Sequence, residues 1–512
     1  MRRASARAAP PPVSRLSTAL GAVLAVVAAL VVFRGTLAYF FAQDDFTGLA
    51  RARGIIPALQ GPWRYLSGQL YFDVMALTAG TSALPYRLVS LLAHATTVAL
   101  VFVRCSRRVA LPAAAALGAI FFGTHPSLFT ALYSVSGIGE ILAGLLAVTT
   151  LLLVARGDRG RWFAVPAFAA SLLCKESTVL LPLGAALVAA RSRAPRRFAV
   201  PIALAIVSAI ALATFVWRDT FGVRAGVETL SPYAVRFGRP ALDNLLSYLG
   251  WTARIALPWV HSFADAVEGG VFADGIVLAA VWLAGCAVPA LRQRGWVEGG
   301  VLWLVLIAPV LPLAHHTYHY YLYSPLTGAA LCVAAAADAV ADWVSRRFGA
   351  RRLVASAVVG ALALLVTVNG ALLVHRIETY PFVDPELRSD PTVDRARIAR
   401  NAIADLEGSA MPPGVSLWFW SPASIARGKS AGADTTQETY WETNVRTALY
   451  DDLAVRVMLP TVREVRFVRT FELVGDSVRY AVYLPNGHLK VGAPSELATV
   501  LGLRPKSEPA PE

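Results

Sequence analysis

Two adjacent carboxylates, Asp44 and Asp45, follow directly after the first long apolar stretch of the chain. At a membrane exit, such a pair could supply a general base that takes a proton from a hydroxyl near the lipid surface. The alternative is a solvated pair, because acidic side chains cost little where a chain leaves a bilayer. A third acid, Glu140, follows His125 and stands near the start of a later apolar run. A Glu there could equally stabilise the N-terminus of a helix through the helix dipole.

Lys175 and Glu176 separate two apolar runs, 162–174 and 177–190, that are too short to cross a membrane. At 1.5 Å per residue each run spans about 20 Å, less than the ~30 Å of a bilayer core. Arginine clusters flank both runs, so we expect a hairpin whose turn is sunk below the opposite surface. A buried lysine needs an anionic partner. Glu176 could be that partner, and the functional alternative is a phosphate or phosphate-linked ligand in an outward-facing cavity.

A third candidate is a loop of histidines and aromatic residues between two later apolar runs. Its members include His315, His316, His319, Tyr320 and Tyr323. Three histidines could indicate a metal, but no neighbouring cysteine or carboxylate completes a zinc site. Aromatic side chains are also expected at a membrane interface. Contact with a sugar or a phosphate is the more specific alternative.

The elements that must position these side chains are membrane spans. The 512 residues are 56% hydrophobic and 16% charged, whereas a soluble domain is nearer half apolar and a quarter charged. Four cysteines over this length exclude a disulfide-built secreted scaffold. The net charge of +14 belongs to the apolar part of the chain. Residues 1–373 contain 31 Lys and Arg against 15 Asp and Glu, whereas residues 374–512 contain 16 Lys and Arg against 18 Asp and Glu. This distribution argues against a nucleic-acid binder.

Eleven apolar runs, most of them near the ~20 residues that a helix needs to cross a bilayer, predict a polytopic α-helical membrane protein. The runs are 16–41, 86–103, 109–127, 136–155, 162–174, 177–190, 198–217, 271–291, 296–313, 325–343 and 352–374. If they alternate from a cytoplasmic N-terminus, every arginine cluster falls inside and the C-terminus falls outside. Residues 241–260 are ambiguous, and we interpret them as an interfacial or re-entrant helix with Trp251 and Trp259 at the membrane surface.

Three segments then lie outside the membrane on the outer face. The first two are the first outer loop (42–84) and the second outer loop (218–270), both within the transmembrane domain 1–374. The third is a soluble domain at 375–503, which is followed by a disordered tail at 504–512. Helical patterns at 394–407 and 436–450, and strand patterns at 414–420, 462–470 and 479–484, predict a small α/β or α+β fold. Its tryptophans, Trp418, Trp420 and Trp441, could line a glycan-binding face or belong to its core.

The ordered motifs resemble the GT-C superfamily of membrane glycosyltransferases, and most closely the protein O-mannosyltransferases and their bacterial relatives. They are FAQDDF (41–46), the run from WRYLSGQL through PYR to the following His (63–102), HPSLFTALYSVSGIGEIL (125–142), SLLCKESTVLLP (171–182) and the loop 315–325. The likeness covers residues 1–343. Such enzymes take a sugar from a polyprenyl-phosphate donor at the outer face and transfer it to an acceptor with inversion of the anomeric carbon.

The resemblance implies a role for each motif residue. Asp44, or alternatively Asp45, would be the catalytic base, and Lys175 would hold the donor phosphate. The other residues implied to contact or orient donor phosphate, sugar or acceptor are Glu176, His125, Glu140, His316, His319, Tyr320 and Tyr323. Ile138 stands where the family carries an arginine, so Arg224 or Arg254 could substitute as a phosphate ligand.

We therefore expect an inverting glycosyltransferase in a bacterial cytoplasmic membrane, with its site facing the periplasm or outside. The 43 arginines against 4 lysines are associated with high-GC bacteria. The expected partners are a lipid-linked sugar donor, membrane lipids, and an acceptor protein, lipid or glycan, with no nucleic acid. No cofactor is expected beyond the polyprenyl-phosphate sugar as co-substrate, and metal dependence is left open. The alternatives are a transporter or flippase of an anionic lipid-linked substrate, for which we find no paired inverted halves, and a non-catalytic scaffold.

Overall fold

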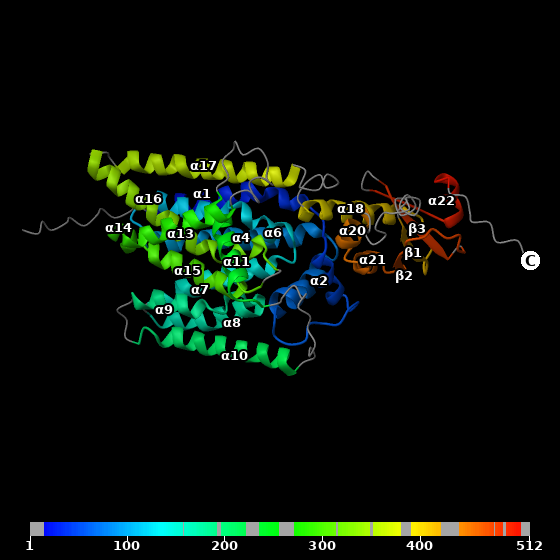
Figure 1. Ribbon diagram of the computed structural model, residues 1–512, viewed down its shortest axis with the longest axis horizontal. Coiled ribbons are helices and arrows are strands. Elements are labelled where there is room, and N and C mark those ends of the chain that lie inside the picture. Colours follow the sequence, from blue (N-terminus) through cyan, green and yellow to red (C-terminus); the bar gives the residue numbers. More distant parts are fainter. Residues whose placement is uncertain are drawn as a thin grey trace, which may run out of the picture.

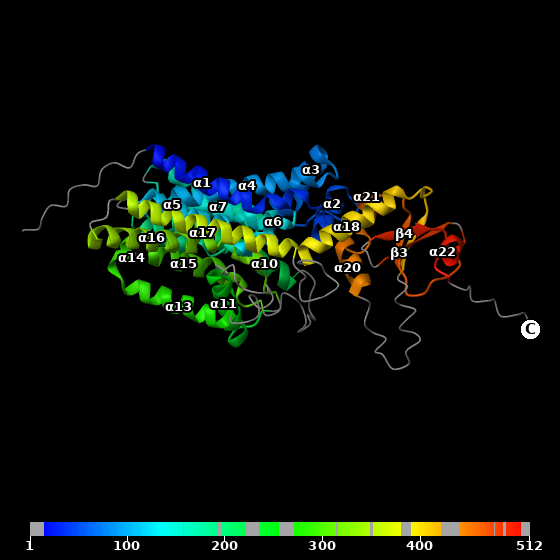
Figure 2. The ribbon, with the colours of Figure 1, turned by 90° about the horizontal axis from the view of Figure 1, so that it is seen from above.

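Long apolar helices build most of the molecule, and a small domain with a β-sheet lies at one end of them (Figure 1). The computed structural model describes residues 15–156, 158–191, 196–221, 235–254, 271–313, 316–348, 352–379, 391–420, 440–475, 477–484 and 488–502. Both views place the sheet domain beyond the same end of the helices (Figures 1 and 2).

The helical body contains long and short helices. Among them are α1 (Arg15–Phe33), α4 (Ala83–Ser106), α5 (Pro112–Gly123), α7 (Ile138–Val154), α8 (Ala164–Cys174), α9 (Leu181–Ala190), α10 (Ala199–Phe221), α11 (Arg239–Ala253), α13 (Val271–Ala287), α14 (Pro289–Gln293), α15 (Trp296–Ile307), α16 (Leu326–Phe348) and α17 (Arg352–Thr379). Between α5 and α6 (Phe129–Tyr133) the chain bends by 45°. The bend falls at His125-Pro126, because a residue before proline is pushed out of the helical region.

The chain is a multi-pass membrane protein. By length and composition, four helices of the described residues can cross a membrane, or five if the bent pair is one span, and five shorter apolar helices accompany them. The outward faces of the long helices are apolar, as shown by the exposed side chains of Leu20, Ile206 and Leu364. A contiguous apolar surface of this kind fits lipid better than water. The count of eleven spans stays a prediction.

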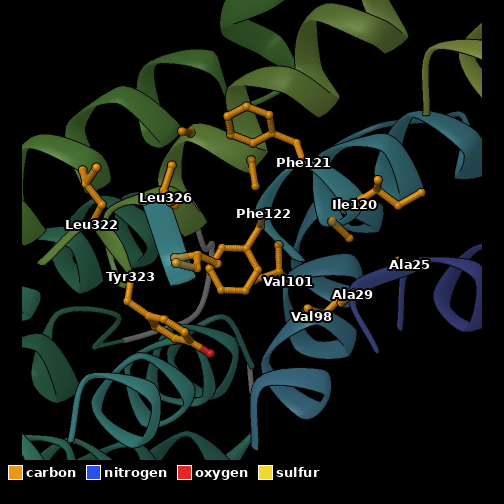
Figure 3. Close-up of a cluster of buried hydrophobic side chains, with 14 of the residues drawn as sticks. Ala25, Ala29, Val98, Val101, Ile120, Phe121, Phe122, Leu322, Tyr323 and Leu326 are labelled. Atoms are coloured by element: carbon orange, nitrogen blue, oxygen red, sulfur yellow. The ribbon is translucent and has the colours of Figure 1, made fainter. Parts of the chain in front are cut away.

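The interior of the helical body is packed with small and aromatic side chains. Figure 3 shows one part of this core, where Phe122 and Tyr323 lie between helices from opposite halves of the sequence. Tyr248 and Leu249 of α11 belong to the same core. The segment 241–260 therefore packs into the body over its described part, and Trp259 lies outside the described residues.

Arginine clusters from separate loops meet at one end of the body. Glu298 at the start of α15 is almost fully buried and forms ion pairs with three of these arginines, Arg104 (2.7 Å), Arg108 (2.7 Å) and Arg191 (3.0 Å). Nearby, Arg294 pairs with Asp338 (2.6 Å). This end, marked by α14 in Figure 1, lies opposite the sheet domain.

The C-terminal domain is a four-stranded mixed sheet with helices. Its elements are α18 (Pro391–Gly408), β1 (Ser416–Trp420), α20 (Tyr440–Leu449), α21 (Leu453–Met458), β2 (Glu464–Phe467), β3 (Val478–Tyr483), β4 (Leu489–Gly492) and α22 (Pro494–Val500). The strand order is β2-β1-β3-β4, with β1 parallel to both neighbours and β4 antiparallel to β3. Trp420 is buried in the domain core beside Tyr480, and Trp418 is partly buried at its edge. The side chain of Trp441 and the tail 504–512 lie outside the described residues.

The C-terminal domain and the first outer loop share one hydrophobic core. The loop contains α2 (Asp44–Ala52), the π-helical turn η2 (Tyr65–Leu70) and α3 (Tyr71–Ala79). Phe46 and Leu49 of α2 pack in the same cluster as Ile398 and Leu406 of α18. The domain is therefore packed onto the loop that carries the two adjacent aspartates.

Candidate active site

The two adjacent aspartates point to different environments. Asp45 is 1% exposed, and its carboxylate accepts hydrogen bonds from the Ser136 backbone N–H (2.7 Å), the Ser134 hydroxyl (3.1 Å) and the Ala42 backbone N–H (3.1 Å). Burial raises the pKa of the Asp45 carboxyl group above its ordinary value. Asp44, at the first position of α2, is exposed. Asp45 thus fixes the loop, and Asp44 is the carboxylate that an incoming molecule can reach.

A buried arginine holds the segment that leads to these aspartates. The Arg87 guanidinium donates to the carbonyl oxygens of Tyr39 (2.7 Å), Phe40 (2.5 Å) and Tyr133 (2.9 Å). The turn that supplies the Ser136 N–H depends on a glycine, because a Cβ on Gly137 would lie 2.2 Å from the Ala131 carbonyl oxygen. Arg87 was not among the predicted site residues. Its position inside an apolar run was the available signal, since charges there are rare and usually functional.

Lys175 is nearly buried, and its ion-pair partner is Glu140. The helix α8 ends at Cys174, and the extended backbone of Lys175 directs its ammonium to 3.2 Å from a Glu140 carboxylate oxygen. The Lys175 side chain is 13% exposed and that of Glu140 is 3% exposed. The rings of Tyr320 and Tyr321 lie 5.3 and 5.6 Å from the ammonium, within cation–π range. The prediction that Glu176 could satisfy Lys175 is thus corrected.

Glu176 instead pairs with Arg64 of the first outer loop. The Arg64 guanidinium donates to both carboxylate oxygens of Glu176, with one N–O distance of 3.0 Å. Arg64 precedes η2 with a left-handed backbone (φ 56°), which is uncommon for a residue with a long side chain. A second tie joins the same segments, because the Ser67 hydroxyl donates to the Cys174 carbonyl (2.7 Å). Nothing in the spacing of the sequence indicates this pair.

His316 lies where the charged groups converge. Its imidazole pairs with the Tyr320 hydroxyl (3.0 Å). Burial, and then the charges of Lys175 and Arg64, lower the pKa of His316, while Asp44 and Glu176 oppose the shift. The Tyr320 ring, whose hydroxyl pairs with His316, lies 5.3 Å from the Lys175 ammonium. His316 and Lys175 are therefore joined through the same tyrosine.

Other predicted site residues lie elsewhere or form a neighbouring group. Tyr323 is buried in the core and its hydroxyl pairs with His94 (2.9 Å), so the structure does not bring it to Lys175. The His319 ring stacks on Trp251 with 3.9 Å between ring centroids.

The remaining predicted residues are His125, Arg254, Arg224 and His315. His125 pairs with the Thr252 carbonyl (3.4 Å), and Arg254 pairs with Asp274 (3.3 Å). Arg224 and His315 lie outside the described residues. Within the described ranges, no group of three or more histidine, cysteine or acidic side chains is arranged to hold a metal ion.

Comparison with known proteins gives structural likenesses and no sequence match. No family model and no curated protein matches the chain. The crystal structure of ArnT from Cupriavidus metallidurans bound to undecaprenyl phosphate is similar over 96% of this chain and 96% of that chain, with a TM-score of 0.44 and 14% sequence identity.

Proposed function

We propose that the chain is an inverting membrane glycosyltransferase that moves a sugar from a polyprenyl-phosphate donor to an acceptor. The observation that carries the proposal is that the first outer loop, whose helix α2 begins at the exposed carboxylate of Asp44, is tied through Arg64–Glu176 and Ser67–Cys174 to the turn that holds the nearly buried Lys175 ammonium. Transfer from a lipid phosphate needs a base for the acceptor hydroxyl and a cation for the phosphate that leaves. The two groups supply these functions from separate elements.

The reaction is a single displacement in which Asp44 is the base. Asp44 accepts the proton of the acceptor hydroxyl while that oxygen forms a bond to the anomeric carbon from the face opposite the phosphate. The bond between the anomeric carbon and the phosphate oxygen breaks, and polyprenyl phosphate leaves with its electron pair. An ammonium has three N–H donors, and Glu140 engages Lys175 through one carboxylate oxygen. The other donors are available to the phosphate oxygens.

Arg64 is the second cation of the proposed site. Its guanidinium is paired with Glu176, and its charge also acts on His316. An arginine can donate to a carboxylate and a phosphate at once, because it has five N–H groups in a planar fork. We assign to Arg64 the phosphate-binding function that the sequence alone suggested for Arg224 or Arg254. Arg254, which pairs with Asp274, then belongs with His125 and His319 to a group of residues beside the proposed site.

The proposed orientation puts this site at the outer face of a bacterial cytoplasmic membrane. Arginine-rich loops favour the cytoplasmic side, and the arginine clusters around Glu298 lie at the end opposite the C-terminal domain. Eleven spans with the N-terminus inside would leave the first outer loop and the C-terminal domain outside. The donor would enter from the outer leaflet, and the acceptor from the aqueous phase.

The test compares envelope lipids, glycans and glycoproteins by mass spectrometry in a deletion strain complemented with matched amounts of each variant. Wild type should restore one hexose- or pentose-sized mass, and Asp44→Asn should not. Asp158→Asn, an exposed acid outside the proposed site, is the matched control and should restore it. Asp45→Asn should mainly reduce the amount of folded protein, because an amide N–H would face the N–H groups of Ala42 or Ser136. Full restoration by Asp44→Asn would refute the assignment of the base. A substrate that only changes sides of the membrane would support the transporter alternative.

A further inference from the structure

Three arginines surround one carboxylate at the end of the helical body that α14 marks in Figure 1, away from the proposed active site. Arg104, in the last turn of α4, and Arg108, just beyond that helix, each lie 2.7 Å from the Glu298 carboxylate. Arg191, which follows α9, lies 3.0 Å from it. These arginines form no ion pair with another carboxylate of the described residues. The cluster therefore carries three positive charges against one negative charge.

The excess positive charge of this arginine cluster is partly buried. The side chains of Arg104 and Glu298 are 5% and 1% exposed. Those of Arg108 and Arg191 are 24% and 32% exposed. Taking a charge out of water is costly unless an opposite charge compensates it. Glu298 compensates one of the three guanidinium groups, so the arrangement favours a further anion beside the other two.

The hydrogen-bond donors of the arginine cluster are in excess as well. The Arg104 guanidinium donates to one Glu298 oxygen (2.7 Å), but its buried Nε–H has no partner among the described residues. Arg108 and Arg191 approach the other oxygen, which accepts no hydrogen bond from the described part of the chain, so these two contacts are ion pairs alone. Guanidinium groups bind phosphate oxygens through paired N–H donors. The cluster thus has both the charge and the donors for a phosphate group.

Aromatic side chains place this end of the body at a boundary between lipid and water. Arg107, in the turn after α4, donates to the Leu152 carbonyl in the last turn of α7 (3.3 Å). The short helix η4 (Arg159–Phe163) comes soon after α7, and its Trp162 and Phe163 are exposed. Exposed aromatic residues of a membrane protein gather at the level of the lipid headgroups. The arginine cluster is therefore at a depth where headgroup phosphates are present.

An apolar surface leads from the arginine cluster into the membrane. Glu298 lies in the first turn of α15, and Val301 and Leu304 are exposed on the next turns of the same helix. Residues three or four apart lie on one side of a helix. An acyl chain that extends from a headgroup at the cluster would contact these two side chains.

We propose that the arginine cluster binds the phosphate of an anionic phospholipid in the leaflet opposite the proposed active site. Arg108 and Arg191 contact the phosphate, and Arg104 stays paired with Glu298. Clusters of arginine beside the membrane attract anionic lipids. The bound lipid joins the ends of α4, α9 and α15, so it stabilises the helical body and takes no part in sugar transfer. The inference goes beyond the proposed function and does not depend on it.

The test measures thermal unfolding of the full-length chain in nonionic detergent after copurified lipid has been washed away. Phosphatidylglycerol should raise the Tm of the wild type, whereas phosphatidylcholine or inorganic phosphate at the same concentration should not. The double variant Arg108→Gln/Arg191→Gln keeps one balanced pair, Arg104 with Glu298, so it should be at least as stable as the wild type in detergent alone. It should show no gain from phosphatidylglycerol. Native mass spectrometry should give an affinity for this lipid roughly 30-fold lower, because two arginine charges are lost.

The matched control is Arg156→Gln/Arg292→Gln, which removes the same formal charge from two exposed arginines of the same end. It should keep the wild-type gain in Tm with phosphatidylglycerol. A similar loss of the gain in this control would show that lipid binding follows net charge alone, and would overturn the assignment of the site.

Three other outcomes would also overturn the inference. An equal gain in the wild type and in Arg108→Gln/Arg191→Gln would show that the lipid acts elsewhere. An equal gain with inorganic phosphate would assign the cluster to a free anion. A wild type without any gain, together with a double variant that is less stable in detergent alone, would show that the arginines serve only to neutralise Glu298 and the helix ends. Inactivity or activity of Asp44→Asn changes none of these outcomes, so the proposed function and this inference can fail separately.

Discussion

The ion pair between Lys175 and Glu140 allows two effects of Lys175 to be measured separately, one on the folding stability of the protein and one on sugar transfer. Lys175→Met removes the ammonium and leaves a 3% exposed carboxylate whose remaining described partner is the Ser177 hydroxyl at 3.3 Å. Removing one member of a buried pair costs about 3–5 kcal/mol, because the other charge stays buried and unpaired. Protonation of Glu140 limits this cost. We expect a clear fall in Tm for the single variant.

The double variant Lys175→Met/Glu140→Gln should recover that stability without recovering activity. With both charges gone, no uncompensated ion remains inside the protein, and replacing a buried pair in this way is often close to neutral. A charge-assisted hydrogen bond to a phosphate contributes about 1.5–3 kcal/mol. At about 1.4 kcal/mol per factor of ten, its loss corresponds to roughly 10- to 150-fold weaker transfer.

Two measurements on the purified chain separate the effect of Lys175 on stability from its effect on activity. Thermal unfolding in detergent gives the stability, and sugar transfer from host polyprenyl lipids gives the activity. Lys490→Met, in β4 of the C-terminal domain, is the control for the loss of a lysine outside the site. A double variant with wild-type Tm and wild-type transfer would refute the reasoning, because Lys175 would then serve only to neutralise Glu140.

Two further predictions concern the supports of the site. Glu298→Gln should lower the unfolding free energy by about 3–5 kcal/mol, because three arginines would lose their buried anion. The control Asp342→Asn changes a side chain that is 42% exposed and should cost at most about 1 kcal/mol. Equal shifts of the two variants in thermal unfolding would contradict this prediction. Deleting 385–512 should expose Phe46 and Leu49, which share the core of the domain, so limited proteolysis should cut within 42–84. A loop as resistant as in the full chain would show that the shared core does not stabilise it.

The sequence predicts the charged residues of the proposed site but not their partners. Asp44 and Lys175 are predicted because each follows an apolar run. The pairing of Lys175 with Glu140 could not be found, because 35 residues separate them and the spacing equally suits Glu176. Arg64 was missed for a related reason, because its partner Glu176 lies 112 residues farther along the chain.

The elements show the same division between local pattern and long-range packing. Three strands lie where alternating residues predicted them, but β4, a strand of only four residues, was not foreseen. The domain was expected as a separate module after residue 374. Only the structure shows that part of its hydrophobic surface packs on Phe46 and Leu49.

The charges of the proposed site favour the departing phosphate over the bound donor. Lys175 and Arg64 each have a carboxylate partner, and Asp44 adds a third carboxylate, so the positive charge of the proposed site does not exceed its negative charge. A lipid-linked phosphodiester brings one negative charge, and the leaving polyprenyl phosphate develops a second. The two cations therefore gain more from the departing phosphate than from the bound donor. Interactions that become stronger as the phosphate leaves lower the activation barrier for sugar transfer rather than merely tighten donor binding. Substitutions of Arg64 and Lys175 should therefore reduce kcat more than they raise the donor KM.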